Sequence, residues 1–468
     1  MRHHRTFSTI VLIACLATII SLHSIVGASW LGIGLTSFLI LKTVMARRFR
    51  GRITPPPDAL DHHRVCIVMP LYNEDPGFAV ASVRSMINQD RRPDRIHVVD
   101  DGSPDGGRAS LAVEHVLRSE ANDLEWEVTR LATNQGKRAA LATGFRAAPD
   151  ADIYVCVDSD TILDHAALAE GVRSFNDRDV AAVAGFVMAE NWSRNVLTRM
   201  IDLRYVSAFL SERAAYSLFG AVLCCCGSLA FFRAEVIRDR LDDFLDQRFL
   251  GQVATFGDDR RLTNYALRAG RVVLCEKARA STAVPERFGH YLRQQIRWNK
   301  SFFRESVWVL GTFPLASGAF WLTLWEIVAW GVVGMLLMAT FAFWPLMAHA
   351  RDALPFIAIV PIAAYARCTA YLEDTRPSMR LSERIGIFAL APLYAVMHLA
   401  VLVPLRMWAL LSLRRARWGT RESVEVRLAH APPPAPPARP ARTLVILPWP
   451  EPPVDWAIPI LAYALAAR

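Results

Sequence analysis

The chain has 468 residues, 53% of them hydrophobic, and carries a net charge of +9. Its mean hydropathy of +0.22 argues against an ordinary soluble protein. The basic excess could suggest nucleic acid, but many arginines adjoin apolar segments, as in cytoplasmic loops of membrane proteins. No aromatic–basic repeat or nucleic-acid module is found, so no nucleic-acid partner is expected. The eight cysteines form no CxxC pair, which disfavours a zinc site or a disulfide framework.

Residues 1–50 predict an N-terminal transmembrane hairpin. The stretch Ser8–Met45 is almost wholly apolar with a break around residues 27–29, which is enough for two spans. A cleaved signal peptide ending at this break is the competing interpretation. Arg2 and Arg5 in front and the basic run Arg47–Arg52 behind favour an uncleaved hairpin with both ends in the cytoplasm.

Residues 51–290 predict an α/β domain with a mostly parallel sheet covered by helices. Short β-type runs alternate there with helical patterns, the arrangement expected of such a domain. The expected strands are Val65–Met69, Ile96–Val99, Trp126–Leu131, Ile153–Val157 and Val180–Val187. The clearest helical patterns are Gly77–Asn88 and Lys137–Ala147.

Apolar segments return in the last third of the chain. Residues 291–318 predict interfacial helices, and residues 319–421 predict a C-terminal transmembrane region in which Ala319–Pro345 and Leu354–Leu372 are long enough to span. Basic residues flank the apolar stretch 385–413 on both sides, which favours a re-entrant or tightly bent helix pair over a single span. Residues 422–468 form a Pro-rich tail to which no role is assigned. We therefore expect a multi-pass protein of the plasma membrane with a cytoplasmic α/β domain.

Asp158-Ser159-Asp160 directly follows an expected strand. In an extended segment residues i and i+2 point to the same side, so Asp158 and Asp160 could bind one ion at the carboxyl edge of the sheet. Carboxylate oxygens suit Mg²⁺ or Mn²⁺, whose coordination substrate phosphates can complete. For an isolated DxD, a turn or helix cap is the more common explanation.

Two further segments have the character of a nucleotide site. Asp100 and Asp101 end an apolar strand ahead of a glycine turn, where carboxylates can accept hydrogen bonds from a base or ribose. Lys137 follows Gly136 at the start of a helical pattern, a place suited to phosphate.

Asp258 and Asp259 follow Gly257 at the start of an amphipathic pattern. An acid at this place is ordinarily a helix cap. The functional interpretation makes one carboxylate a general base that takes the proton of an attacking hydroxyl.

Gln294, Arg297 and Trp298 share one helix face through their i, i+3 and i+4 spacing. Arginine binds phosphate bidentately, and the indole offers a flat platform for a sugar ring. An interfacial helix with Trp and Arg at the lipid headgroups explains the same residues and is compatible with that function.

These motifs together resemble the processive family-2 glycosyltransferases with a GT-A fold, which carry a D, D, D, QxxRW pattern. The similarity covers roughly residues 64–421, and the hyaluronan synthase branch is the most similar in the segments Gly257–Ala266 and Gln294–Ser306. The sequence Trp418-Gly419-Thr420-Arg421 resembles a WGTR motif shared with chitooligosaccharide synthases of the nodulation type.

The resemblance implies a role for each matching residue. Asp259 would be the catalytic base, and Asp158 and Asp160 would bind Mg²⁺ or Mn²⁺. Substrate contacts would come from Asp100, Asp101, Lys137, Asp158, Asp258, Arg233, Gln294, Arg297, Trp298, Trp418 and Arg421. The implied partners are UDP-GlcNAc and UDP-GlcA as donors, a growing polysaccharide as acceptor, and membrane lipid.

One segment departs from the pattern. Cys224-Cys225-Cys226-Gly227-Ser228 is similar to the chitooligosaccharide branch in its cysteines, and Ser228 stands where both branches usually have proline. Three hypotheses therefore stay open. They are a hyaluronan synthase that translocates its product, a chitin-oligosaccharide synthase that uses UDP-GlcNAc alone, and a non-catalytic membrane scaffold.

Overall fold

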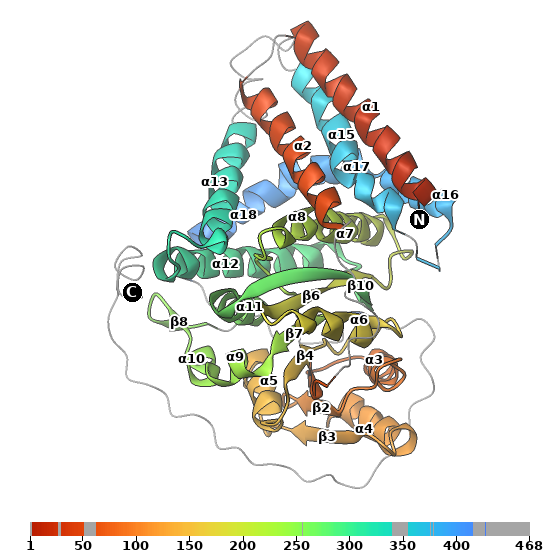
Figure 1. Cartoon of the computed structure of the whole chain (residues 1–468), viewed down its shortest axis with the longest axis vertical. Helices are drawn as coiled ribbons and strands as arrows, with labels where there is room; N and C mark the ends of the chain where they lie inside the picture. Colours follow the sequence, from red (N-terminus) through yellow and green to blue (C-terminus); the bar gives the residue numbers. More distant parts are fainter. Residues whose placement is uncertain are drawn as a thin grey trace.

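The computed structural model of the chain describes residues 2–26, 30–50, 62–254, 256–338, 354–374, 376–377, 379–414 and 426. In Figure 1 a sheet-containing part occupies the lower half, and four helical rods, α1, α2, α13 and α15, stand above it. Helices α7, α8, α12 and α18 lie between the two. The predicted division into an α/β domain and flanking apolar helices is thus visible in the arrangement of the elements.

A mixed sheet forms the centre of the lower half. Within the described residues its strand order is β3-β2-β1-β4-β7-β6-β10-β5. Its strands are β1 (Val65–Leu71), β2 (Arg95–Asp100), β3 (Glu125–Arg130), β4 (Ile153–Cys156), β5 (Thr161–Leu163), β6 (Val180–Ala189), β7 (Ala230–Arg233) and β10 (Arg271–Thr282). Strand β7 runs antiparallel to both neighbours, and β5 antiparallel to β10. The five expected strands are confirmed to within a few residues. The sheet is mostly parallel, as expected, and becomes mixed through β5 and β7 alone among the described strands.

Helices on both faces bury this sheet. Strand β1 is buried at every position, as its continuous apolar run indicates for a strand covered on two sides. The covering helices include α3 (Pro76–Ile87), α4 (Arg108–Glu120), α5 (Lys137–Arg146), α6 (Ala167–Arg173), η1 (Ser174–Asn176), α9 (Ala234–Arg238), α10 (Leu241–Leu245) and α11 (Asp258–Ala269). A small hairpin, β8 (Arg248–Phe249) and β9 (Gln252–Val253), precedes α11.

Four elements form the layer above the sheet. Helix α7 (Val196–Ser207) begins with a capping box made by Asn195 and Thr198. It continues through the π-helical turn η2 (Ala208–Arg213) into α8 (Ala214–Ser217). Helix α12 (Phe288–Thr312) packs against α11 below and against α13 and α18. This layer connects the sheet with the apolar helices.

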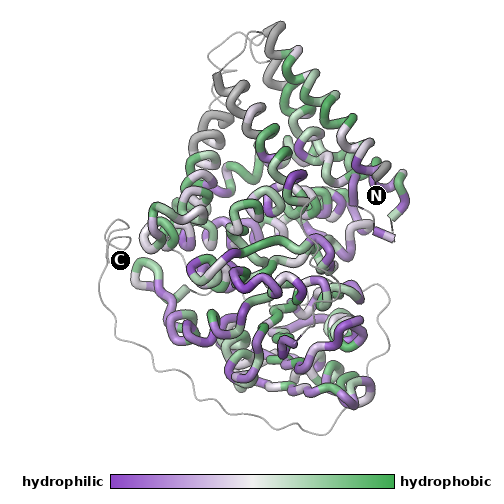
Figure 2. Tube along the Cα trace, viewed as in Figure 1, coloured by the Kyte–Doolittle hydropathy of each residue, from purple (hydrophilic) through white to green (hydrophobic). Residues whose placement is uncertain are grey.

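The apolar helices are α1 (Arg2–Val26), α2 (Trp30–Arg50), α13 (Gly318–Met338) and α15 (Leu354–Cys368), with the short turn η5 (Thr369–Glu373) after α15. Figure 2 shows apolar residues along α1, in contrast to the mixed surface of the lower half. Two stretches of the described residues, His4–Leu22 and Leu381–Leu411, are long and apolar enough to cross a bilayer. Buried core helices and signal sequences can share this property, so it indicates but does not establish a membrane span.

The stretch 381–411 differs from its predicted shape. It forms one run of helical segments, α16 (Leu381–Phe388), α17 (Ala391–Met397), the π-turn η6 (His398–Leu402) and α18 (Val403–Leu411). Pro392 lies in the first turn of α17 and Pro404 in the first turn of α18, where a missing backbone N–H costs little. The segments follow one another across the view in Figure 1, with α17 against α15 and α18 against α12. The predicted tight reversal is therefore corrected to a continuous run.

Candidate active site

A cavity of about 490 Å³ lies between the carboxyl edge of the sheet and the layer of helices above it. Its floor includes Lys137, Asp158 and Asp259, which come from α5, the end of β4 and α11. Its opposite side reaches α13, α17 and α18 through residues such as Glu326, Tyr394 and Arg406. The π-helical turn η2 also contributes wall residues, as such turns frequently do at functional sites. The cavity thus extends from the predicted acids to the apolar helices.

Asp158 is held by two donors. The ammonium of Lys137 binds its Oδ1, and the hydroxyl of Ser228 donates to its Oδ2 at 3.1 Å. Burial alone would lower the pKa of Lys137, but the Asp158 carboxylate holds that pKa above its ordinary value. Lys137 is therefore a cation in the cavity. Its contact with Asp158 could be replaced by a contact with phosphate oxygens.

The Asp158–Asp160 segment forms a turn and does not continue the strand. Strand β4 ends at Cys156, and the backbone N–H of Thr161 donates to the carbonyl of Asp158 at 3.0 Å. The carboxylate of Asp160 accepts from the Thr282 hydroxyl at 3.0 Å, and Asp160 is not among the residues that line the cavity. The reasoning from an extended segment is therefore corrected.

The two acids that end β2 have different environments. Asp100 accepts from the hydroxyls of Ser103 at 2.7 Å and Ser110 at 2.5 Å, so it supports its own loop. Asp101 accepts from the backbone N–H groups of Gln135 at 2.7 Å and Gly136 at 2.8 Å. Burial raises the pKa of Asp101 to about 6 although these amides oppose it. Asp101 thus anchors the loop that leads to Lys137, and neither acid lines the cavity.

Adjacent acids at the start of α11 have different partners. Asp258 also borders the cavity, but its side chain is buried and its Oδ1 accepts from Nε of Arg138 at 2.9 Å. Asp259 lines the cavity; its Oδ2 lies 3.5 Å from the thiol of Cys224 and its Oδ1 accepts the Arg260 N–H at 2.9 Å. Burial raises the pKa of Asp259, although Arg260 and Lys137 oppose the shift. A carboxylate in a cavity with a raised pKa is suited to accept a proton.

Helix α12 brings Arg297 and Trp298 to the cavity wall. Trp298 is 45% exposed, and its ring centroid lies 6.3 Å from that of Tyr205 on α7. The cavity is lined by Gln295, whereas Gln294 is not among its lining residues. The aromatic platform and the guanidinium therefore face the cavity, and the amide expected beside them comes from the neighbouring position.

Arg233 lies away from the cavity. Its guanidinium donates to the backbone carbonyls of Val180 at 2.7 Å and Phe175 at 3.0 Å. Arg233 pairs with Ile153, the first residue of β4, so it lies at the end of that strand opposite to Asp158. The structure therefore does not bring Arg233 to the cavity with the other predicted residues. Trp418, Arg421 and the Pro-rich tail, except for residue 426, lie outside the described residues.

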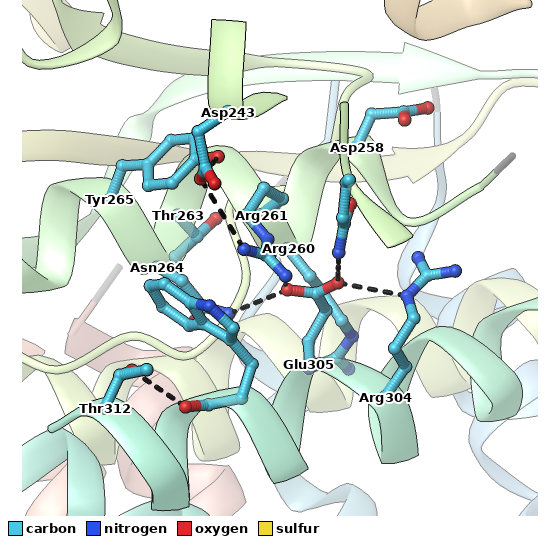
Figure 3. A network of polar contacts seen from close by, with 12 residues as sticks. Asp243, Asp258, Arg260, Arg261, Thr263, Asn264, Tyr265, Arg304, Glu305 and Thr312 are labelled. Atoms are coloured by element: carbon cyan, nitrogen blue, oxygen red, sulfur yellow. Dashed lines mark hydrogen bonds and ion pairs between the residues drawn. The ribbon is translucent and has the colours of Figure 1, made fainter. Parts of the chain in front are cut away.

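A buried network behind α11 was not anticipated from the sequence. Glu305 of α12, which is 2% exposed, accepts from Nε of Arg261 at 2.9 Å and Nε of Arg304 at 3.2 Å. Asn264 also donates to it at 3.2 Å (Figure 3). Gln247 donates to it at 2.5 Å. Burial would raise the pKa of Glu305, but the two arginines hold it below its ordinary value. The network fixes α11, the helix that carries Asp259, to α12.

The carboxylates fit a particular kind of metal site. Across the part of the chain that the structure describes, no three His, Cys, Asp or Glu residues gather as a ready-made metal site. Asp158 lines the cavity, and its carboxylate supplies oxygen ligands of the kind that hard cations prefer. Asp160 follows two positions later in the sequence. Such a donor set suits Mg²⁺ or Mn²⁺, which commonly bind one or two carboxylates together with substrate phosphates and water.

Known proteins resemble this chain in sequence and in fold. The family described as "Glycosyl transferase family 2" matches residues 66–241. Hyaluronan synthase from Streptococcus pyogenes is 37% identical over 407 residues, which cover 84% of this chain and 91% of that protein. An N-acetylglucosaminyltransferase from Azorhizobium caulinodans is 33% identical over 364 residues, which cover 77% and 88%. The mannosyltransferase PcManGT from Pyrobaculum calidifontis, solved with GDP-Man and Mn²⁺, has a TM-score of 0.53 at 20% identity, covering 86% of this chain and 99% of that one, and so shows the fold.

Proposed function

Because this chain belongs to the hyaluronan synthase type of the family-2 glycosyltransferases, we propose that it polymerises UDP-GlcNAc and UDP-GlcA into hyaluronan and translocates the product. Its membership makes it a glycosyltransferase, and the expected GT-A fold is confirmed with a mixed sheet. The non-catalytic scaffold is therefore set aside. The observation that carries the proposal is the cavity that joins Asp158 and Asp259 to the apolar helices.

The residues of the cavity floor supply donor binding. Lys137 and Asp158 lie where a diphosphate would bind, and Asp101 supports the loop in front of Lys137. A bound Mg²⁺ or Mn²⁺, held by Asp158 together with phosphate oxygens of the donor, would stabilise the charge of the departing diphosphate. Asp160 was the second expected ligand, but its carboxylate accepts from Thr282 and does not line the cavity. Arg297 would add a forked donor for phosphate from the opposite wall.

Asp259 is the proposed general base. The acceptor hydroxyl oxygen attacks C1 of the donor sugar while the bond from C1 to the diphosphate oxygen breaks, so UDP leaves with the bonding electrons. The hydroxyl proton passes to Asp259, and attack from the face opposite the diphosphate inverts the anomeric centre. Trp298 offers an exposed apolar surface on which the acceptor sugar would lie.

The wall beyond the acids supports an anionic product. Arg213, Arg297 and Arg406 line it, and these guanidinium groups would attract a polymer that carries a carboxylate on every second sugar. Glu212 and Glu326 line the same region, so the wall is not uniformly basic. This composition supports the two-donor polymer over an uncharged one.

Membrane integration is part of the proposal. Three isoleucines of α1, Ile10, Ile13 and Ile20, are about 60% exposed, as expected of side chains that face lipid. The basic residues after α2 and around α16–α18 favour a cytoplasmic catalytic domain and a multi-pass arrangement in the plasma membrane.

A chitin-oligosaccharide synthase is the second candidate. Its support is the 33% identical N-acetylglucosaminyltransferase, together with the cysteines of residues 224–228. Such an enzyme would use the same acids but only one donor.

One assay separates the two candidates. Isolated membranes that contain the protein receive Mg²⁺ or Mn²⁺ and UDP-GlcNAc, with or without UDP-GlcA. We expect long polymer only when both donors are present, and we expect hyaluronidase to degrade it. Polymer formed from UDP-GlcNAc alone would contradict the hyaluronan proposal and support the alternative. Membranes with the Asp259→Asn variant control for other transferases.

A further inference from the structure

Ser228 faces the acid proposed to bind the donor because of the strand register. Strands β4 and β7 are antiparallel neighbours, with Cys156 opposite Ala230. Two residues beyond that pair, the chain places Ser228 next to Asp158, and the Ser228 hydroxyl donates to Asp158 Oδ2 at 3.1 Å. The hydrogen bond thus joins two loop residues that flank a fixed strand pair, and it does not depend on a long side chain.

Ser228 and Lys137 hold different oxygens of the same carboxylate. Lys137 binds Oδ1 with an ammonium at the end of a flexible stem, whereas Ser228 binds Oδ2 through a single-carbon side chain. Each carboxylate oxygen has a second lone pair, so a cation or a water can still bind Asp158. Because the Ser228 side chain is short, its hydrogen bond restricts the orientation of the carboxylate more than the flexible stem of Lys137 does.

The backbone of this loop lies close to the ion pair. A Cβ on Gly227 would lie 2.8 Å from Lys137 Nζ and 3.2 Å from Asp158 Oδ1. The first of these distances is shorter than van der Waals contact allows, so a side chain at residue 227 would displace Lys137. Glycine at this position lets the Ser228 backbone approach the acid.

The other end of the loop is fixed to the base-bearing helix. The Cys225 N–H donates to the Thr263 hydroxyl of α11 at 2.9 Å, and Arg213 donates to the Cys224 carbonyl at 3.1 Å. The Cys224 thiol lies 3.5 Å from Asp259 Oδ2. One five-residue loop therefore contacts the donor-binding acid at one end and the proposed base at the other.

We infer that Ser228 is a positioning residue for donor binding: its hydroxyl orients the Asp158 carboxylate toward the metal–diphosphate group. This inference rests on the proposed function. Hydrogen-bond partners of metal-binding carboxylates commonly change metal affinity or activity about 10- to 100-fold when they are removed. Loss of the Ser228 hydroxyl is expected to weaken donor binding while leaving Asp259 able to accept a proton.

The test uses the full-length protein, purified in detergent, with Mn²⁺ and UDP as probes. Binding of Mn²⁺ in the presence of UDP is followed by the loss of the free-ion electron paramagnetic resonance signal. Ser228→Ala should weaken this binding about 10-fold or more and raise the donor KM more than it lowers kcat. Ser228→Thr keeps the hydroxyl and should restore most of the affinity. Ser119→Ala is the matched control, because the Ser119 hydroxyl bonds backbone carbonyls of its own helix α4.

A second substitution covers the case in which Ser228→Ala does not accumulate. Ser228→Cys keeps the side chain's shape but replaces the hydroxyl with a weak S–H donor, so it should show the same loss. Unchanged Mn²⁺–UDP binding in these variants would overturn the inference alone, as would Ser228→Thr binding as weakly as Ser228→Ala. Absence of Mn²⁺–UDP binding in the unmodified protein would overturn the proposed function itself, and the inference with it.

Discussion

Arg138 and Asp258 form a buried ion pair, 2.9 Å from Nε to Oδ1, that joins the first turn of α5 to the first turn of α11. Lys137 precedes Arg138 and Asp259 follows Asp258, so each residue of the pair adjoins a residue of the cavity floor. The pair therefore holds the proposed donor-binding cation and the proposed base in a fixed relation. Asp258 thus holds the two helices together, whereas its neighbour Asp259 is the proposed base.

Asp258→Ala is expected to destabilise the protein by about 3–5 kcal/mol, because Arg138 would be left as an uncompensated buried charge. Thermal unfolding of the purified protein measures this loss. The control is Asp242→Ala, which breaks an exposed pair with Arg146 and should change stability by less than about 1 kcal/mol. Equal effects of the two substitutions would contradict the structural role of Asp258.

Asp259→Asn is expected to lower kcat about 10²- to 10⁴-fold, the usual contribution of a general base, while UDP binding stays unchanged. The base acts only when ionised, and burial raises the pKa of Asp259. The rate should therefore fall on acidification at a pH above the ordinary range of an aspartate. Initial rates of sugar incorporation across pH measure this limb. A fully active asparagine variant would rule out Asp259 as the base.

Acidification below about pH 6 is expected to raise the donor KM through Asp101. Its pKa is raised to about 6, and its ionised form accepts the two backbone N–H groups that order the loop before Lys137. As the pH falls through this value the carboxylate takes a proton. The protonated oxygen is a weaker acceptor, so one of the two hydrogen bonds that order the loop is weakened. Donor KM between pH 5 and 8 measures the effect. Asp101→Asn, which has no such titration, should have a higher KM with a flatter profile.

Trp298→Ala is expected to shorten the product and to raise the acceptor requirement, because the exposed indole would no longer support a sugar ring. Trp298→Phe should keep most of the activity. The control is Phe288→Ala, since Phe288 lies on the same helix with the same 45% exposure but is not a cavity residue. Product length on a gel reports the difference. If both alanine variants behaved alike, the loss could not be assigned to the cavity.

Glu305→Ala is expected to cost about 3–5 kcal/mol, because Arg261 and Arg304 would lose their buried counter-charge. Glu305→Gln keeps the shape but not the charge and should show a smaller loss. Glu120→Ala, which removes an exposed pair with Arg84, is the control and should have little effect. Unfolding temperatures of the three variants measure these losses. A Glu305→Ala variant as stable as Glu120→Ala would contradict the anchoring role of Glu305.

The sequence was most informative where residues follow a buried strand. Lys137, Asp158 and Asp259 were singled out because apolar strands and helix starts place such side chains at the carboxyl edge of a sheet, and all three line one cavity. Periodicity also located the main strands to within a few residues. These features depend on local pattern, which a single sequence carries.

The position of Arg233 could not be predicted from the local sequence pattern. It follows Ser228 by five residues, and only the family resemblance implied a substrate contact for it. Strand β7 is antiparallel to β4, so it leads away from the cavity. Strand direction depends on pairing between distant segments, which periodicity does not reveal. Glu305 was missed for a related reason: its partners are 44 residues away on α11 for Arg261 and 58 residues away for Gln247.

Helix α12 places Trp298 on the cavity wall and, two turns later, Glu305 in the network that anchors α11. Seven residues of helix span roughly 10 Å, so the proposed sugar platform and the residue that anchors the helix of the proposed base belong to one short stretch of α12. Helix α12 therefore cannot tilt Trp298 without also displacing α11, which carries Asp259. We therefore expect the polymer to slide over a stationary indole each time it advances by one sugar. The contact between Trp298 and the polymer would then form anew with the next sugar, and the indole would not move along with the chain.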